Sequence, residues 1–183
     1  VPYLNKFHKQ FPHVHIKVTN QTSIACASLL EHGQVDFIVV NYPNSALSST
    51  HIPRVINEFH DVFVANRQYF PLDGREVSLA SLQKYPILML DRKSTTSEFL
   101  HAMFQRSHLD LVPEIELSSN DLLIDLARIG LGIAFVPDFC IPTDDKDLFV
   151  VKLKEELPKR QMVVAYNERM PLSQTAKQFM SML

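Results

Sequence analysis

The chain of 183 residues has few of the features that usually identify a protein's chemistry. No apolar run approaches the roughly twenty residues that span a bilayer, and the beginning lacks the basic and apolar regions of a signal peptide. Lysines and arginines are scattered singly or in pairs, and the net charge is only −2 with histidine taken as neutral. We therefore expect no membrane partner, and we do not expect this segment to wrap DNA by itself.

Cysteine and glycine are also scarce. The two cysteines, Cys26 and Cys140, cannot form a disulfide framework, which favours a reducing, cytoplasmic setting. We expect Cys26, inside a predicted helix, to be a structural core residue rather than a redox sensor.

Catalytic and metal-binding motifs are absent from the sequence. It contains no G-x-S-x-G, P-loop, G-x-G-x-x-G or H-E-x-x-H pattern, and the glycines at 130 and 132 follow a predicted helix where a dinucleotide site needs them before one. His13 and His15 would share a strand face, but no carboxylate or cysteine stands at ligand spacing. We expect neither an enzyme, nor a metal site, nor a cofactor.

The clearest pattern that is present covers residues 113–137, PEIELSSNDLLIDLARIGLGIAFVP. Alternating apolar residues predict a strand, Ser119 or Asn120 supplies an N-cap oxygen, and Gly130 ends the helix before a buried apolar run. The predicted core face of the helix consists of Leu122, Leu123, Leu126 and Ile129. The stretch therefore predicts a βαβ unit.

The same pattern occurs in residues 14–40. VHIKVTN alternates like a strand, Thr22 or Ser23 is the cap, and Gly33 ends a helix before the apolar run FIVV. Two such units about a hundred residues apart predict an α/β protein with two similar lobes, each with a parallel sheet and a right-handed crossover. With 46% hydrophobic residues, the chain can bury two modest cores.

The remaining elements follow from similar signals. We predict a helix over residues 1–11 that Pro12 ends, and a helix capped by Ser78. Thr95 and Glu98 predict a capping box at the start of a further helix. Other predicted strands and a last helix cover residues 54–65, 87–90, 148–153, 161–166 and 173–183. A helix at the very beginning suggests a missing first strand, and we expect the C-terminal part to complete the first lobe.

Four phrases in this order carry a family resemblance: FHKQFPHVHIKV, EHGQVDFIVV, YPILMLDRKSTTSEFL and NDLLIDLARIGLGIAFVP. Together they resemble the effector-binding domain of LysR-type transcriptional regulators over essentially the whole chain. The resemblance implies a type 2 periplasmic-binding-protein-like fold of two Rossmann-like lobes with a ligand cleft between them. It places lobe I in residues 1–61 and 140–183 and lobe II in residues 62–139. The family's DNA-binding domain, linker helix and first strand with its loop would lie outside this chain.

The resemblance also directs attention to the helix beginnings, where free backbone N–H groups and a positive dipole end suit a carboxylate or other small anion. Arg92 and Lys93 could add positive charge beside one of them. The residues alone leave open whether the hydroxyls bind a ligand or merely cap helices. The candidate effector-binding residues are Thr22, Ser23, Asn41, Tyr42, Ser94, Thr95, Thr96, Ser119, Asn120, Val136 and Pro137.

We therefore expect a small-molecule sensor that forms a homodimer or homotetramer, with an effector that changes how the two lobes are arranged and so modulates transcription. The helix of residues 1–11 and the strand predicted over residues 15–18 would contribute to a subunit interface. The alternative is an extracytoplasmic solute-binding protein that delivers a ligand to a transporter. Upstream residues would discriminate them, since a helix-turn-helix favours regulation and an apolar signal sequence excludes it.

Overall fold

The computed structural model describes residues 2–183 and divides the chain into two compact units. Unit 1 consists of Val1–Asn57 and Gln161–Leu183, and unit 2 consists of Glu58–Arg160. The predicted lobe boundaries differ from this division, because residues 58–61 and 140–160 belong to unit 2. The reason is strand pairing: β8 (Leu148–Val150) pairs with β3 (Asp61–Asn66) in one sheet of unit 2.

The main sheet of unit 2 has five strands in the order β6-β5-β7-β3-β8. The strand β5 (Ile87–Leu90) runs parallel to both β6 (Ile115–Leu117) and β7 (Ile133–Pro137). By contrast, β3 is antiparallel to β7 and β8, so the sheet is mixed rather than wholly parallel. Every residue of β5 and β7 is buried, as their unbroken apolar runs predict. Unit 2 also contains a separate two-stranded parallel ladder, formed by β4 (Glu76–Val77) and β9 (Lys152–Leu153).

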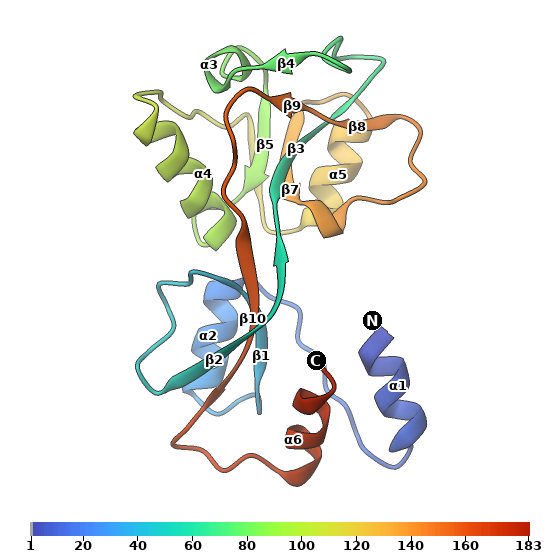
Figure 1. Cartoon of the computed structure of the whole chain (residues 1–183), viewed down its shortest axis with the longest axis vertical. Coiled ribbons are helices and arrows are strands. Elements are labelled where there is room, and N and C mark those ends of the chain that lie inside the picture. The colour runs from blue at the N-terminus through green and yellow to red at the C-terminus, as the bar shows by residue number, and fades with distance from the viewer. Residues whose placement is uncertain (1) are drawn as a thin grey trace. The chain divides into compact units, whose positions relative to one another are not determined.

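Helices cover both faces of this sheet. The helices α4 (Thr95–Arg106) and α5 (Asn120–Arg128) lie on opposite sides of it (Figure 1), and the short helix α3 (Leu79–Leu82) and the 3-10 turn η1 (Asp138–Cys140) complete the unit. Leu100 and Phe104 of α4 pack in one core, whereas α5 contributes to a second core. Alternating β3 side chains join the two cores in turn, since successive strand residues point to opposite faces.

The predicted core face of α5 is wrong by part of a turn. Leu123 is fully buried, and the other buried residues of the helix are Ile124 and Ala127. Leu122 and Ile129, predicted to face the core, are 47% and 61% exposed. Both faces have apolar residues at helical spacing, so periodicity alone could not decide between them.

Unit 1 contains the three-stranded sheet β1-β10-β2. Its strands are β1 (Ile38–Tyr42), β2 (His51–Phe59) and β10 (Arg160–Asn167), and the last residues of β2 and the first of β10 reach into unit 2. Its helices are α1 (Pro2–Gln10), α2 (Ser23–Glu31) and α6 (Gln174–Ser181). The sheet packs against α2 in a core that includes Leu30, Val40 and Val163. Residues 161–183 thus belong to the same unit as the N-terminal part of the chain.

The parallel βαβ unit predicted for residues 14–40 is wrong. In the described part of the chain, residues 14–20 form no strand, and most of their side chains are exposed. A strand needs a neighbour for its backbone hydrogen bonds, and β1 pairs instead with β10 in an antiparallel ladder. The helix α2 and the strand β1 that follow were predicted correctly.

Several helix ends match their sequence signals. Thr22, Ser78 and Ser119 are N-caps, and Gly130 follows α5 with a φ of 83°, a conformation that glycine adopts readily. The predicted capping box at Thr95 is wrong, because the helix begins one residue earlier and its N-cap is Ser94.

Candidate functional site

The candidate residues of unit 2 gather at one edge of its sheet. The strands β5, β6 and β7 are parallel, so their carboxyl ends share this edge, and α4 and α5 both begin there (Figure 1). Open α/β sheets characteristically bind ligands outside the carboxyl ends of their strands. The residues brought together at this carboxyl edge are Ser94, Thr95, Thr96, Ser119, Asn120, Val136 and Pro137.

Two serine caps define the helix beginnings at the carboxyl edge. The Oγ of Ser94 accepts a hydrogen bond from the backbone N–H of Ser97 at 3.1 Å, and the Oγ of Ser119 accepts one from Leu122 at 3.3 Å. Each cap satisfies only one of the free N–H groups at a helix start. Both ends therefore keep donors and a positive dipole end for a ligand acceptor.

A buried arginine links the start of α4 to the sheet. One Nη of Arg160 donates to Asp61 Oδ2 at 2.6 Å and to Thr96 Oγ1 at 3.2 Å, and the other donates to Thr95 Oγ1 at 2.9 Å. Asp61 lies opposite Pro137 in the β3–β7 ladder. Arg160, Asp61, Thr95 and Thr96 thus form one hydrogen-bonded group, which we call the Arg160 cluster.

The Arg160 cluster is almost completely withdrawn from water. The side chains of Arg160 and Asp61 are 2% and 0% exposed, and the guanidinium lies over the rings of Phe59 and Phe99 at 5.4 and 5.2 Å. Such burial is tolerated only because the two charges are paired. Burial raises the pKa of Asp61, and the charge and hydrogen bond of Arg160 act in the opposite direction.

Some polar atoms at this edge have no partner. Among the described residues, no hydrogen bond reaches Asp61 Oδ1, Arg160 Nε, Ser97 Oγ or Asn120 Oδ1, although all four atoms are buried. An unsatisfied buried polar atom is uncommon in a folded protein, so each of these four atoms is a candidate for contact with a ligand or water.

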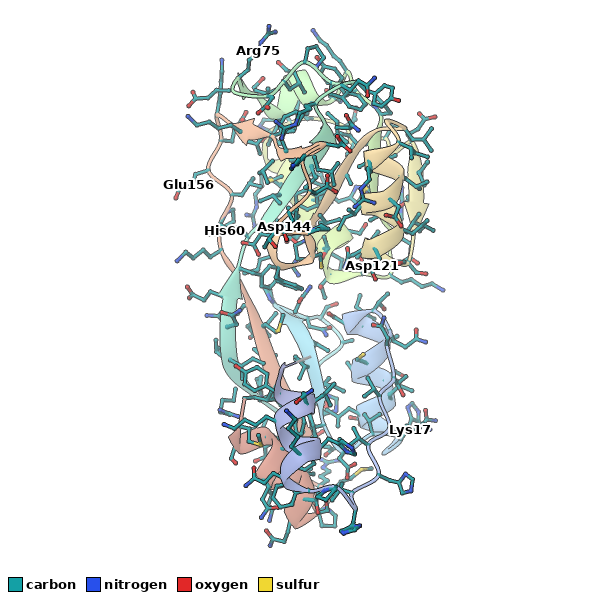
Figure 2. All side chains as sticks on the ribbon, turned by 90° about the vertical axis from the view of Figure 1, so that its right-hand side faces the viewer. Lys17, His60, Arg75, Asp121, Asp144 and Glu156 are labelled. Carbon is teal, nitrogen blue, oxygen red and sulfur yellow. The ribbon has the colours of Figure 1, made fainter. Side chains whose placement is uncertain are left out.

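Other acidic groups lie near the carboxyl edge. Burial, and then the charges of Asp121, Asp61 and Asp138, raise the pKa of the Cys140 thiol to about 11. Asp121 lies at the beginning of α5, where Figure 2 labels it, and Asp138 opens η1. Besides Asp61, two further carboxyl groups therefore lie near Cys140 at this edge.

Unit 1 brings its own candidates together. Thr22 caps α2 by accepting a hydrogen bond from the N–H of Ala25 at 3.3 Å, and Ser23 Oγ accepts one from the N–H of Asn41 at 3.0 Å. Asn41 and the 38% exposed Tyr42 end β1. The start of α2 and the carboxyl end of β1 are therefore joined directly, and we call these four residues the unit 1 set.

Sequence reasoning missed Arg160 and Asp61. Each stands at the start of a strand that continues into apolar residues, and a charge that such a strand buries needs a partner. The two residues are 99 positions apart, and no local spacing reports such a pair. The fold brings the pair together: Asp61 begins β3, which lies beside β7, and Arg160 donates hydrogen bonds both to Asp61 and to Thr95 at the start of α4.

Other kinds of site are not evident among the described residues. Among the described residues, no group of three or more histidine, cysteine, aspartate or glutamate side chains is arranged to hold a metal ion. Cys26 is buried and unpaired, and burial raises the pKa of its thiol. Within residues 2–183, the helices are too short or too polar for any of them to traverse a bilayer.

Comparison with known proteins gives a consistent result. The family model described as "LysR substrate binding domain" matches residues 1–183. A curated relative, the transcriptional activator CmpR of Synechocystis, is 23% identical over 98% of this chain and 59% of its own length. The transcriptional regulator TtuA of Agrobacterium vitis is 25% identical over 74% of this chain and 45% of its own length. The chain thus spans about half the length of these relatives.

Solved structures show the same fold. The regulatory domain of CcmR from Synechocystis, in complex with 2-PG, has a TM-score of 0.88 at 19% identity and covers 99% of this chain and 89% of its own. The effector-binding domain of QuiR, in complex with shikimate, has a TM-score of 0.82 at 14% identity, covering 98% and 86%. The fold is the two-lobe, type 2 periplasmic-binding-protein-like fold.

Proposed function

This chain belongs to the LysR substrate-binding domain family, and we propose that it is the part of a transcriptional regulator that binds a small-molecule effector. The curated relatives named above are a transcriptional activator and a transcriptional regulator, so the comparisons do not favour a transporter's solute-binding protein. Contact with DNA would be made by a part of the whole protein outside these residues, in the cytoplasm.

The observation that carries this proposal is the carboxyl edge of unit 2. Two helices begin there with serine caps, and buried polar atoms without partners lie beside them. Such an edge can hold an oxygen-rich ligand through backbone N–H groups and hydroxyls, and the proposed ligand is a small carboxylate or another small anion. We propose that the unit 1 set also contributes to binding, since it offers a helix start and a strand end of the same kind.

The proposal is tested by a thermal-shift screen of small carboxylates, since a specific ligand stabilises the state that binds it. Thr95→Ala combined with Thr22→Ala should then weaken binding of the effector found by more than it lowers thermal stability. If the two substitutions lower the thermal stability equally with and without the effector, both residues have structural roles only.

Two serine caps of unit 2 provide a matched control. Ser119 lies at the carboxyl edge, whereas Ser78 caps α3 and is not a candidate binding residue. Each accepts one helix N–H, at 3.3 and 3.2 Å, so either serine-to-alanine change should cost about 1 kcal/mol of stability. Only Ser119→Ala should also weaken effector binding, and an equal effect of Ser78→Ala on binding would argue against the assignment.

We further propose that the chain forms a homodimer or homotetramer through α1 and the segment after it. Tyr3, Ile16 and Val18 are 46%, 38% and 67% exposed, so these segments present large apolar side chains that a second copy of the chain could cover. Light scattering across a concentration series should show assemblies larger than one chain. A monomer at every concentration would exclude the interface.

A further inference from the structure

Within the proposed effector site, we infer that Asp61 is a specificity-determining residue: by neutralising Arg160, it restricts the carboxyl edge of unit 2 to effectors of low charge. This inference rests on the proposed function and adds the charge class of the ligand. It excludes ligands such as phosphates with two negative charges, which an unpaired arginine at the same place would favour.

The first step is the geometry of the Arg160 cluster. Arg160 is the buried cation at the start of α4, and its Nη lies 2.6 Å from the Asp61 carboxylate. At such a distance the carboxylate of Asp61 compensates the charge of Arg160, so the pair as a whole carries no net charge. The ligand therefore meets a pair with little net charge rather than a cation.

The second step is the state of the two hydroxyls. Thr95 Oγ1 and Thr96 Oγ1 both accept a hydrogen bond from Arg160. A hydroxyl that accepts in this way keeps its own hydrogen available for donation. Arg160 therefore orients Thr95 and Thr96 as donors, which suits a ligand oxygen that accepts hydrogen bonds, charged or neutral.

The third step is the surrounding charge. Asp121 and Asp138 lie close enough to Cys140 for their charges to act on its thiol, and Asp61 acts on it as well. His60 faces Asp138 with its Nδ1 3.8 Å away. Arg92 and Lys93 at the turn before α4 are exposed, so water and salt screen their charges. Lys159, the neighbour of Arg160 in the chain, is also exposed and is paired with Glu58. A multiply charged anion would thus face nearby carboxylates without a free buried cation.

The fourth step is the pair of unsatisfied atoms. Asp61 Oδ1 and Arg160 Nε are buried without a hydrogen-bond partner among the described residues. One is an acceptor and the other is a donor, so they suit a polar ligand group that both donates and accepts, such as a hydroxyl or a protonated carboxyl. The dianion of a phosphate monoester carries no hydrogen on its phosphate oxygens and could satisfy only the donor.

The test uses inorganic phosphate as the probe and isothermal titration of the whole chain. Wild type should bind phosphate no more tightly than the weakest affinity that the titration can measure, and this limit is the reference for the variants. Asp61→Asn keeps the size and an acceptor for Arg160 but leaves the arginine charge uncompensated, so phosphate should bind at least about tenfold more tightly than to wild type. Adding Arg160→Gln to Asp61→Asn should abolish the gain.

Asp121→Asn is the matched control. It removes the same charge from the same edge, but Asp121 is exposed and is not paired with Arg160. Its effect on phosphate binding should be less than about twofold because solvent screens it. If Asp61→Asn does not fold, as judged by circular dichroism, Asp61→Ser replaces it with the same expected result.

The possible results separate this inference from the proposed function. Phosphate binding by wild type, or a folded Asp61 variant that gains none, overturns the inference, whatever the carboxylate screen finds. A wild-type effector whose affinity is unchanged by Thr95→Ala and Ser119→Ala overturns the proposed site, even if Asp61→Asn gains phosphate binding.

Discussion

Replacing Arg160 by methionine should leave the buried carboxylate of Asp61 without its partner charge. Methionine keeps a long apolar stem between the rings of Phe59 and Phe99, so little volume is lost. The Asp61 side chain is 0% exposed, and without Arg160 neither of its oxygens would have a described partner, since Oδ1 already has none. Breaking a buried ion pair by removing one member costs about 3–5 kcal/mol, because the other charge is left uncompensated.

The loss should also depend on pH. Burial raises the pKa of Asp61 and Arg160 opposes that rise, so Arg160→Met should move the pKa further upward. Above the ordinary aspartate pKa, the folded variant would then bind a proton that the unfolded chain does not. Its stability should therefore fall as pH rises, and the difference from wild type should be larger at pH 8 than at pH 5.

Urea unfolding followed by circular dichroism at both pH values measures these differences. With a slope of about 2 kcal/mol per molar urea, a loss of about 4 kcal/mol lowers the midpoint by about 2 M. The double variant Asp61→Leu with Arg160→Met removes both charges and should recover most of the loss, because it leaves no unpaired ion. A single variant that loses less than about 1 kcal/mol, or one no worse than the double variant, would refute this reasoning.

Two further predictions concern Gly130 and Cys140. Gly130→Ala should lower the free energy of unfolding by about 1 kcal/mol more than Gly74→Ala. Both glycines have a positive φ, of 83° and 71°. A Cβ added at Gly130 would lie 2.5 Å from the Tyr69 ring, whereas a Cβ added at Gly74 meets nothing within 4 Å. Urea unfolding checks this, and equal losses would contradict it. In a Cys26→Ala background at pH 8, iodoacetamide should alkylate Cys140 about a hundredfold more slowly than an ordinary thiol, since its pKa is about 11 rather than 9.0. A rate that does not rise when the chain is unfolded in urea would contradict that.

The sequence identified the elements with strong local signals. For residues 113–137, the predicted N-cap, the helix end at Gly130 and the buried strand are all correct, because each is determined by neighbouring residues. The side of α5 that faces the core was not, since Leu122 and Leu123 are adjacent and equally apolar. Tertiary packing decided between them.

Pairing between distant strands was beyond the reach of the sequence. Residues 14–18 alternate between apolar and polar residues as a strand should, yet they form no strand. Alternation indicates only which face of a strand would be buried, and it supplies no neighbouring strand for the backbone hydrogen bonds. Residues 140–160 were assigned to the first lobe because no capped helix separates their strand signals. In the structure, β8 completes the edge of the unit 2 sheet beside β3.

The candidate binding residues show the same limit. Hydroxyls before helices could be recognised locally, and Ser94, Thr95 and Thr96 indeed gather at the start of α4. What the hydroxyls of Thr95 and Thr96 can do depends on Arg160, which lies 64 or more residues away along the chain. The hydrogen bonds that these hydroxyls accept are therefore a property of the fold and not of the local motif.

The Arg160 cluster lies close to the two points where the chain passes between the units. The chain passes between the units at 57/58 and at 160/161, and Asp61 and Arg160 lie within four residues of these crossings. The ion pair between Lys159 and Glu58, at 3.3 Å, joins the same two segments. One guanidinium donates to both Asp61 and Thr95, so it ties the start of α4 to the segments through which the chain enters and leaves unit 2.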